Sequence, residues 1–309
     1  MEIEKILKDL IEIPSVTSDT NSCKKAINYI NTLVTQEGLR TKIFENKKTF
    51  CLLIAKEIKQ KYEIILNGHL DVVPAPLAQF KPVIKIQDGK RIMYGRGTSD
   101  MKGPNVSILL AFIESIKEGI DIDMALLFTT DEETGGFNGT KYLIEQGISS
   151  DIIFIPDGGK DWSICTGEKG VFQIKFIAKG ISAHGSRVWL GDNAIEKLIK
   201  VYRNIETEFN KRWGKPTKKK NWIPTINLGA LNGGNAANKV PNEAEMLIDI
   251  RYPLPMQQLD FEKIIEKSLV NNVTWKPIST GAPLETDDKS KYFKKWVSLI
   301  EDPIFEKEP

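Results

Sequence analysis

The sequence predicts an α/β protein with two domains, and three observations lead to this prediction. The chain has 309 residues, which is long for one hydrophobic core. Nearly continuous apolar runs at residues 62–68, 124–130 and 151–157 are typical of parallel strands that are buried on both faces. From about residue 170, apolar and polar residues alternate instead, as in a sheet with one solvated face.

The N-terminal part alternates helix and strand patterns. Apolar residues at helical spacing predict a helix over residues 3–11, and a second is expected over 22–38, ending at Gly38. Residues 50–56 form a further strand-like run, and the segment 103–119 keeps a helical apolar pattern with Pro104 in its first turn. This βαβ order predicts a mostly parallel sheet covered by helices.

An inserted α+β domain is predicted over residues 171–279. Its expected order is strand, helix, two strands and helix, at residues 171–180, 192–213, 222–231, 243–252 and 259–270. This order is typical of a small α+β sandwich of the ferredoxin-like kind. A helix over 289–302 is expected to rejoin the first domain, which would comprise residues 1–170 and 280–309.

Composition excludes several classes of protein. The 43 basic and 41 acidic residues nearly balance, which argues against a nucleic-acid partner. Three scattered cysteines fit reduced thiols in a cytoplasmic protein. The N-terminus is charged, unlike a signal peptide, and the densest apolar stretch, 106–113, is too short to cross a membrane. The lysine-rich segment 215–220 is most simply a solvated loop.

Acidic residues follow the three buried strands at the point where each one ends. The candidates are His69 and Asp71 after the first strand, Asp131, Glu132 and Glu133 after the second, Asp157 after the third, and Asp100 just before the helix 103–119. Ligands of such sheets bind beyond the carboxyl ends of the strands. Crowded carboxylates repel one another unless cations neutralise them, so we expect a metal site here.

Histidine and carboxylate ligands without cysteine suit zinc, manganese or cobalt in a catalytic site. His69 and Asp71 are two residues apart, so they share a face of an extended chain, and Asp71 can accept the second imidazole N–H. Glu132 and Glu133 are adjacent and point apart unless a turn intervenes. One of them can bind metal while the other acts as general base on a water.

Other interpretations exist for each single motif. A lone His-x-Asp pair is more often structural, and adjacent acids after a strand usually form a solvated turn. The segment 95–100, "GRGTSD", is similar to a phosphate-binding loop. However, Asp100 replaces the third glycine, and the segment does not directly follow a strong buried strand, so a nucleotide-binding dehydrogenase is disfavoured.

Taken together, the motifs resemble a known family. The matching stretches are "GHLDVVP", "YGRGTSDMKG", "DEETGG", "PDGG", "SAHGS…GDNAI" and "GGNAANKVPNEAEMLIDIR". In their order and spread along the chain they are similar to the two-zinc exopeptidases and deacylases. This family includes succinyl-diaminopimelate desuccinylase, acetylornithine deacetylase, aminoacylase and glutamate carboxypeptidase. The resemblance implies a zinc-exopeptidase-like α/β/α catalytic domain with an inserted lid domain.

The resemblance also implies a role for each candidate residue in the first domain. His69, Asp100 and Asp157 would hold one Zn²⁺, with Co²⁺ or Mn²⁺ as alternatives. Asp100 would bridge to a second ion that Glu133 also holds. Glu132 would be the general base, and Asp71 would orient His69.

Three residues of the inserted domain would complete the machinery. The resemblance implies that His184 reaches the active site of a neighbouring subunit and steadies the oxyanion. Arg251 and Asn238 would meet the carboxylate of the substrate. The inserted domain would then be the surface through which a homodimer forms.

The implied activity is hydrolysis of the amide bond of N-acyl amino acids or short peptides by a metal-activated water. The sequence departs from the family pattern at its C-terminus, because the second metal normally takes a further His from a later segment and this chain ends at Pro309. We therefore expect a C-terminally truncated member whose second metal site is incomplete. The alternative hypothesis is a non-catalytic member with one metal site or none, acting as a dimeric structural or binding protein.

Overall fold

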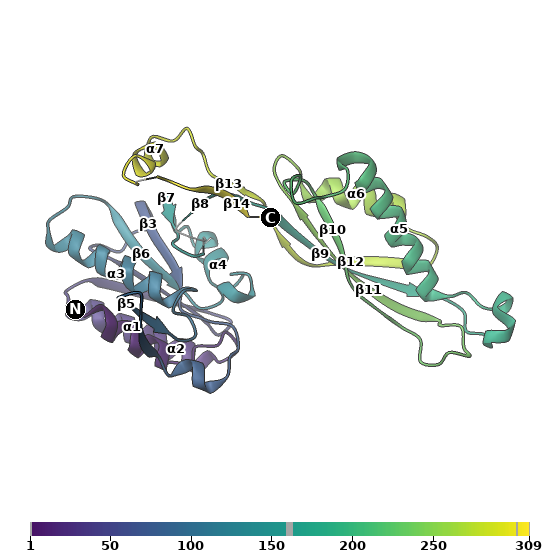
Figure 1. The fold of residues 1–309 in the computed structure, drawn as a ribbon, viewed down its shortest axis with the longest axis horizontal. Helices are drawn as coiled ribbons and strands as arrows, with labels where there is room; N and C mark the ends of the chain where they lie inside the picture. The colour runs from purple at the N-terminus through teal and green to yellow at the C-terminus, as the bar shows by residue number, and fades with distance from the viewer. Residues whose placement is uncertain (1, 159–162, 301, 309) are drawn as a thin grey trace. The chain divides into compact units, whose positions relative to one another are not determined.

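The computed structural model describes residues 2–158, 163–300 and 302–308. The chain divides into two compact units, residues 1–160 and residues 161–309 (Figure 1). Both units combine helices and strands, so the predicted α/β fold class is confirmed.

The first unit is built around a five-stranded mixed sheet. Its elements are α1 (Ile3–Glu12), α2 (Thr20–Gln36), β1 (Arg40–Asn46), β2 (Thr49–Ala55), β3 (Lys61–His69), η1 (Leu77–Phe80), β4 (Val83–Gln87), β5 (Lys90–Tyr94), α3 (Lys102–Lys117), β6 (Met124–Thr129), η2 (Glu132–Thr134), α4 (Thr140–Glu145) and β7 (Ser149–Phe154). The strand order is β1-β2-β6-β3-β7, and β4 and β5 form a separate hairpin. The three strands predicted from continuous apolar runs, β6, β3 and β7, are parallel to one another. Strand β2 pairs in antiparallel fashion with β6 on one side and with β1 on the other.

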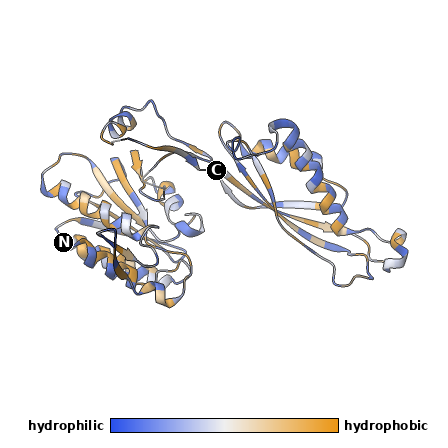
Figure 2. Ribbon diagram, in the orientation of Figure 1, coloured by the Kyte–Doolittle hydropathy of each residue, from blue (hydrophilic) through white to orange (hydrophobic). Residues whose placement is uncertain are grey.

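Helices cover both faces of this sheet. One core cluster joins α1, α2 and α3 to β2 and β6 through residues such as Leu10, Ile27 and Phe112. A second cluster on the other face includes Leu143 of α4. Figure 2 shows the predominantly hydrophobic strands between these layers. Burial on both faces is the reason that β2 and β6 are continuous apolar runs.

The prediction for residues 151–157 was wrong in one respect. The strand β7 forms, but it lies at the edge of the sheet, where exposed and half-buried residues alternate along it. Ile153 is 54% exposed. An apolar run predicts a strand, but it cannot distinguish a central position from an edge position, because that depends on which strands pair.

The second unit contains a four-stranded antiparallel sheet of order β10-β11-β9-β12. Its elements are β8 (Ile164–Glu168), β9 (Gly170–Lys179), η4 (Gly185–Leu190), α5 (Ala194–Trp213), β10 (Thr225–Gly233), β11 (Glu243–Tyr252), α6 (Gln258–Ser268), β12 (Val273–Gly281), β13 (Leu284–Glu285), α7 (Lys291–Val297) and β14 (Phe305–Glu308). The order β9-α5-β10-β11-α6-β12 is ferredoxin-like, and its first five elements match the predicted order. Strand β12 was not foreseen.

The two long helices of this unit, α5 and α6, share a core with the sheet (Figure 1). On β9, the buried residues Phe172, Ile174 and Phe176 alternate with half-buried ones, as the period-two pattern predicted. The ring of Phe261 on α6 lies 5.5 Å from that of Phe209 on α5, measured between centroids. This packing explains the apolar spacing of both helices.

A smaller sheet of order β13-β8-β14 belongs to the second unit, as does α7. The helix α7 is shorter than the predicted segment 289–302; Ser290 caps its first turn, and the Pro303 that follows disfavours helical conformation just before it. The domain boundaries at residues 170/171 and 279/280 remain a prediction. In the described residues, the helices lack the combination of length and apolar character that crossing a bilayer requires.

Candidate metal centre

Three parallel strands bring the predicted ligands to one edge of the first unit's sheet. His69 is the last residue of β3 and pairs with Thr129 at the end of β6. Glu132 begins η2, three residues after β6 ends, and Asp157 follows β7 by three residues. The carboxyl ends of the strands therefore supply the side chains, as expected for this class of sheet.

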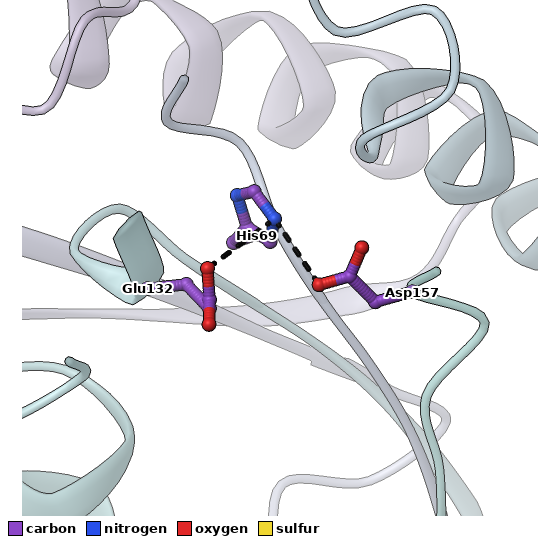
Figure 3. A group of neighbouring side chains, drawn as sticks. All are labelled: His69, Glu132 and Asp157. Atoms are coloured by element: carbon purple, nitrogen blue, oxygen red, sulfur yellow. Dashed lines mark ion pairs between the residues drawn. The ribbon is translucent and has the colours of Figure 1, made fainter. Parts of the chain in front are cut away.

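The imidazole of His69 lies at the centre of the acidic cluster. It is 1% exposed, and its Nε2 lies 3.1 Å from Asp100 Oδ1, 3.4 Å from Asp157 Oδ2 and 3.7 Å from Glu132 Oε2. Figure 3 shows the Asp157 and Glu132 carboxylates turned toward this nitrogen. A single ring nitrogen thus faces three carboxylates from separate parts of the chain.

Two sets of three ligands have geometry suitable for a metal ion. His69, Glu132 and Asp157 form one set, and His69, Asp100 and Glu133 form the other, with the ligand atoms of each set within 4.8 Å of one another. Imidazole nitrogen and carboxylate oxygens suit zinc, cobalt or manganese. The sets share His69, whereas the resemblance implied sharing of Asp100, and the division of ligands between ions remains a prediction.

The electrostatics of the cluster also fit a cation. Partial burial raises the pKa of Glu132, as do the nearby acids Asp157, Asp71 and Glu133, while His69 counteracts them. Partial burial and Asp100 likewise raise the pKa of Glu133. Burial lowers the pKa of His69, but hydrogen bonds to Asp157 and Asp71 outweigh it and raise the pKa to about 11. A divalent ion would replace this proton and relieve the repulsion.

Asp71 is fully buried behind the histidine. Its backbone oxygen lies 2.9 Å from His69 Nδ1, and its carboxylate Oδ1 lies 3.4 Å from the same atom. The backbone N–H groups of Glu132 and Glu133 donate to the two carboxylate oxygens at 3.3 Å. The hydroxyl of Thr17 donates to Oδ2 at 2.8 Å. Asp71 therefore joins the histidine to the turn that carries both glutamates.

The third acid after β6, Asp131, does not belong to either ligand set. It is buried, and its Oδ2 accepts hydrogen bonds from the backbone N–H groups of Asn138 and Gly139. Gly135, with φ of +96°, provides the turn that follows Glu133. Asp131 thus closes the loop 131–139, and the expectation that it joins the metal cluster was wrong because its side chain points into that loop.

The three predicted residues of the second unit lie at two ends of its sheet. The backbone of His184 forms a bridge with Lys239, and Gly185 N–H donates to the oxygen of Asn238, so His184 and Asn238 are neighbours. On β11, Glu243 pairs with Lys179 and Arg251 pairs with Val171, which puts Arg251 about 27 Å along the strand from this end. The side chain of Arg251 forms an ion pair with Asp249 at 2.9 Å.

Two buried or half-buried residues near this centre were not predicted from the sequence, Thr17 and Lys102. Thr17 lies 54 positions before Asp71, and its sequence context carries no signal for this contact. Lys102 is fully buried at the start of α3. A signal was present for Lys102, because it precedes Val106 and Leu109 at helical spacing on the apolar face of that helix.

Comparison with known proteins agrees with the site and the fold. The model of peptidase family M20/M25/M40 matches residues 65–307. A probable succinyl-diaminopimelate desuccinylase of Staphylococcus aureus strain MRSA252 is 27% identical over 97% of this chain and 80% of its own length. A succinyl-diaminopimelate desuccinylase of Rickettsia felis is 33% identical over 80% of this chain and 68% of its own length.

Solved structures share the fold at low sequence identity. The M20 family metallo-carboxypeptidase Sso-CP2 from Sulfolobus solfataricus aligns with a TM-score of 0.75 and 17% identity, covering 100% of this chain and 86% of its own. The aminopeptidase PepT from Bacillus cereus gives a TM-score of 0.75 and 16% identity, with 99% and 84% covered.

A histidine among carboxylates at the carboxyl edge of a sheet, on this fold, defines a metal-dependent hydrolase of the peptidase and amidohydrolase class. The chain belongs to peptidase family M20/M25/M40. The resemblance predicted from the sequence motifs is thereby confirmed, and membership implies a divalent metal.

Proposed function

We propose that this chain is a metal-dependent hydrolase of the amide bond in N-acyl amino acids or short peptides with a free carboxylate. One observation carries the proposal: His69 Nε2 faces the carboxylates of Asp100, Asp157 and Glu132 within 3.7 Å at the carboxyl edge of the sheet. The names of the desuccinylase relatives support a deacylase, and those of the structural neighbours include a carboxypeptidase.

His69, Asp100, Asp157 and Glu133 would hold the metal, as the resemblance implies, and zinc is the ion we propose. When bound, the metal would supply Lewis-acid polarisation of the substrate carbonyl and of the attacking water. The ligand side chains come from four separate segments, so folding of the chain is needed to bring them together.

Glu132 would be the general base. It would take a proton from the attacking water and return it to the leaving amine. The Glu132 side chain is 53% exposed, so water and substrate can reach it. Its pKa is raised above that of an ordinary glutamate and so lies nearer to pH 7, where a general base works best. The hydrogen bond from its backbone N–H to Asp71 keeps its turn against His69.

His184 would steady the oxyanion in the active site of a partner subunit. Ser186 N–H donates to His184 Nδ1, so the proton of the neutral ring lies on Nε2, which is then a hydrogen-bond donor. The exposed ring and the neighbouring Asn238 suit contact with a bound substrate. Arg251 would meet the substrate carboxylate, with Asp249 as its present partner.

The partner subunit would be a second copy of this chain. Exposed apolar residues adjoin His184: Ile181 is 61% exposed, Trp189 75% and Leu190 61%. An apolar patch of this kind next to a functional loop is typical of an interface. We further propose a cytoplasmic location, which the bacterial desuccinylase relative and the three scattered cysteines support.

Substitution of the base tests the function. In E132Q, the side chain keeps its size and loses the proton acceptor. We expect hydrolysis of N-succinyl and N-acetyl amino acids and of dipeptides to fall by about 10²–10⁴-fold, with the metal content of the protein unchanged. The matched control is E145Q, an exposed glutamate of α4, which should keep wild-type turnover.

Retained turnover in E132Q would contradict the base assignment. A wild-type protein that binds metal and cleaves none of these substrates would favour the non-catalytic alternative. Elemental analysis of the same samples separates these outcomes, because it reports the metal independently of turnover.

A further inference from the structure

Lys102 is a fully buried lysine that the proposed chemistry does not use. Its Nζ donates hydrogen bonds to the backbone oxygens of Leu10, at 2.9 Å, and Ile13, at 2.8 Å. A buried ammonium is costly unless hydrogen bonds and charge compensate it. Its partners lie at the C-terminal end of α1, where the helix dipole is negative and the last turn contains no basic residue of its own.

The segment 97–101, which we call the Asp100 loop, folds around the stem of this lysine. The backbone N–H of Lys102 donates to Gly97 O at 2.7 Å. Gly97 has φ of +84°, and a Cβ there would lie 3.0 Å from Lys102 Cδ. The absence of a side chain at Gly97 therefore lets the loop lie directly on the aliphatic part of Lys102.

The other side of the Asp100 loop contacts the end of β3. Met101 is fully buried, and the backbone N–H of His69 donates to its Sδ at 3.3 Å. Asp100 itself is 60% exposed, yet its Oδ1 lies 3.1 Å from His69 Nε2. Its position is therefore set by the two buried residues that follow it in the sequence rather than by burial of its own side chain.

We infer that Lys102 is a positioning residue that ties the Asp100 loop to the end of α1 and so holds the Asp100 carboxylate against His69. This inference rests on the proposed function, in which Asp100 is a metal ligand. Residues that orient a metal ligand typically change metal affinity by 10–100-fold when they are replaced. A purely structural lysine would change stability and leave metal affinity alone.

The test compares K102M with K169M. Methionine is unbranched and adapts to the space of the lysine stem, but it donates no hydrogen bond. Lys169 is a matched control in the second unit: it is 7% exposed, and its Nζ donates to the backbone oxygen of Asn221. We expect K102M to bind Zn²⁺ and Co²⁺ about 10–100-fold more weakly than wild type, and K169M to bind them as wild type does.

A double-mutant cycle with D100A identifies the residue through which Lys102 acts. If Lys102 acts through Asp100, K102M weakens metal binding in the wild-type background and not in the D100A background. Hydrogen exchange gives a readout that needs no metal, because the amides of residues 97–102 should exchange faster in K102M. With substrate, kcat should fall while KM changes little.

Equal metal affinity of wild type and K102M would overturn this inference and leave the proposed function intact. A wild-type protein that takes up neither Zn²⁺ nor Co²⁺ would overturn the proposed function and this inference with it. If K102M does not fold, G97A replaces it, because an added Cβ pushes the loop off the lysine stem while keeping the ammonium. Wild-type metal affinity in G97A would then contradict the inference.

Discussion

The backbone oxygen of Asp71 lies 2.9 Å from Nδ1 of His69, closer than the carboxylate Oδ1 of the same residue at 3.4 Å. The backbone carbonyl is thus the nearer acceptor for the ring N–H. The carboxylate is occupied on its other sides by Thr17 and by the backbone N–H groups of Glu132 and Glu133. The carboxylate raises the pKa of His69 and also holds the turn that carries the two glutamates.

The separate contacts of the Asp71 carbonyl and carboxylate predict the behaviour of D71N. The backbone carbonyl remains, so His69 should keep its orientation and the protein should keep its metal. One carboxylate oxygen becomes an amide that cannot accept a hydrogen bond, so the turn at Glu132 and Glu133 loosens. We expect turnover to fall by about 10–100-fold, with metal content measured by elemental analysis unchanged.

The control for D71N is D151N, an exposed aspartate that pairs with Lys61 on the sheet. It should match wild type in both measurements. Loss of metal from D71N would show that the carboxylate, rather than the carbonyl, orients the imidazole.

The raised pKa of His69 predicts that metal binding releases protons. In the metal-free protein this pKa is about 11, so the ring is protonated at pH 7. A metal ligand must be neutral imidazole, so binding should release about one proton from this group. Calorimetry in buffers of different ionisation enthalpy measures the number, and affinity should rise with pH.

The raised pKa of His69 also determines how the stability of the metal-free protein depends on pH. The folded-state pKa lies above the unfolded value of about 6.5, so the folded state binds more protons between pH 6.5 and about 11. The contribution of His69 to the free energy of unfolding is complete below the lower limit and is lost as pH rises through this window. H69Q should lose this dependence, and a wild-type pH profile for the unfolding of H69Q would contradict the raised pKa of His69.

The exposed patch beside His184 predicts an effect of W189E on assembly. Trp189 is 75% exposed, and a carboxylate in the centre of an apolar interface would be buried without a partner. We expect light scattering to give a dimer for wild type and a monomer for W189E. The control is L77E in the first unit, where Leu77 is 79% exposed, and this variant should remain a dimer. A wild-type monomer, or a W189E dimer, would refute the proposed interface.

The sequence predicted much of the fold because burial leaves a clear pattern. Continuous apolar runs located β3, β6 and β7, and helical spacing located α1, α2, α3, α5 and α6. Strands β4 and β5 were missed because their hairpin is largely exposed and carries no burial pattern. Strand β12 was missed for a similar reason, since Val273 is the one buried residue along it.

The sequence by itself predicted that His69, Glu132, Glu133 and Asp157 would converge, because the carboxyl ends of parallel strands meet at one edge whatever else surrounds them. Asp100 comes from the loop before α3, and its place beside His69 depends on the tertiary structure. Only the tertiary structure decided that Asp131 turns away, that Thr17 reaches Asp71, and that Lys102 binds the end of α1. These contacts join segments up to 92 positions apart. The contacts of Thr17 and Lys102 depend on how distant segments pack together, and local patterns of residues do not encode that packing.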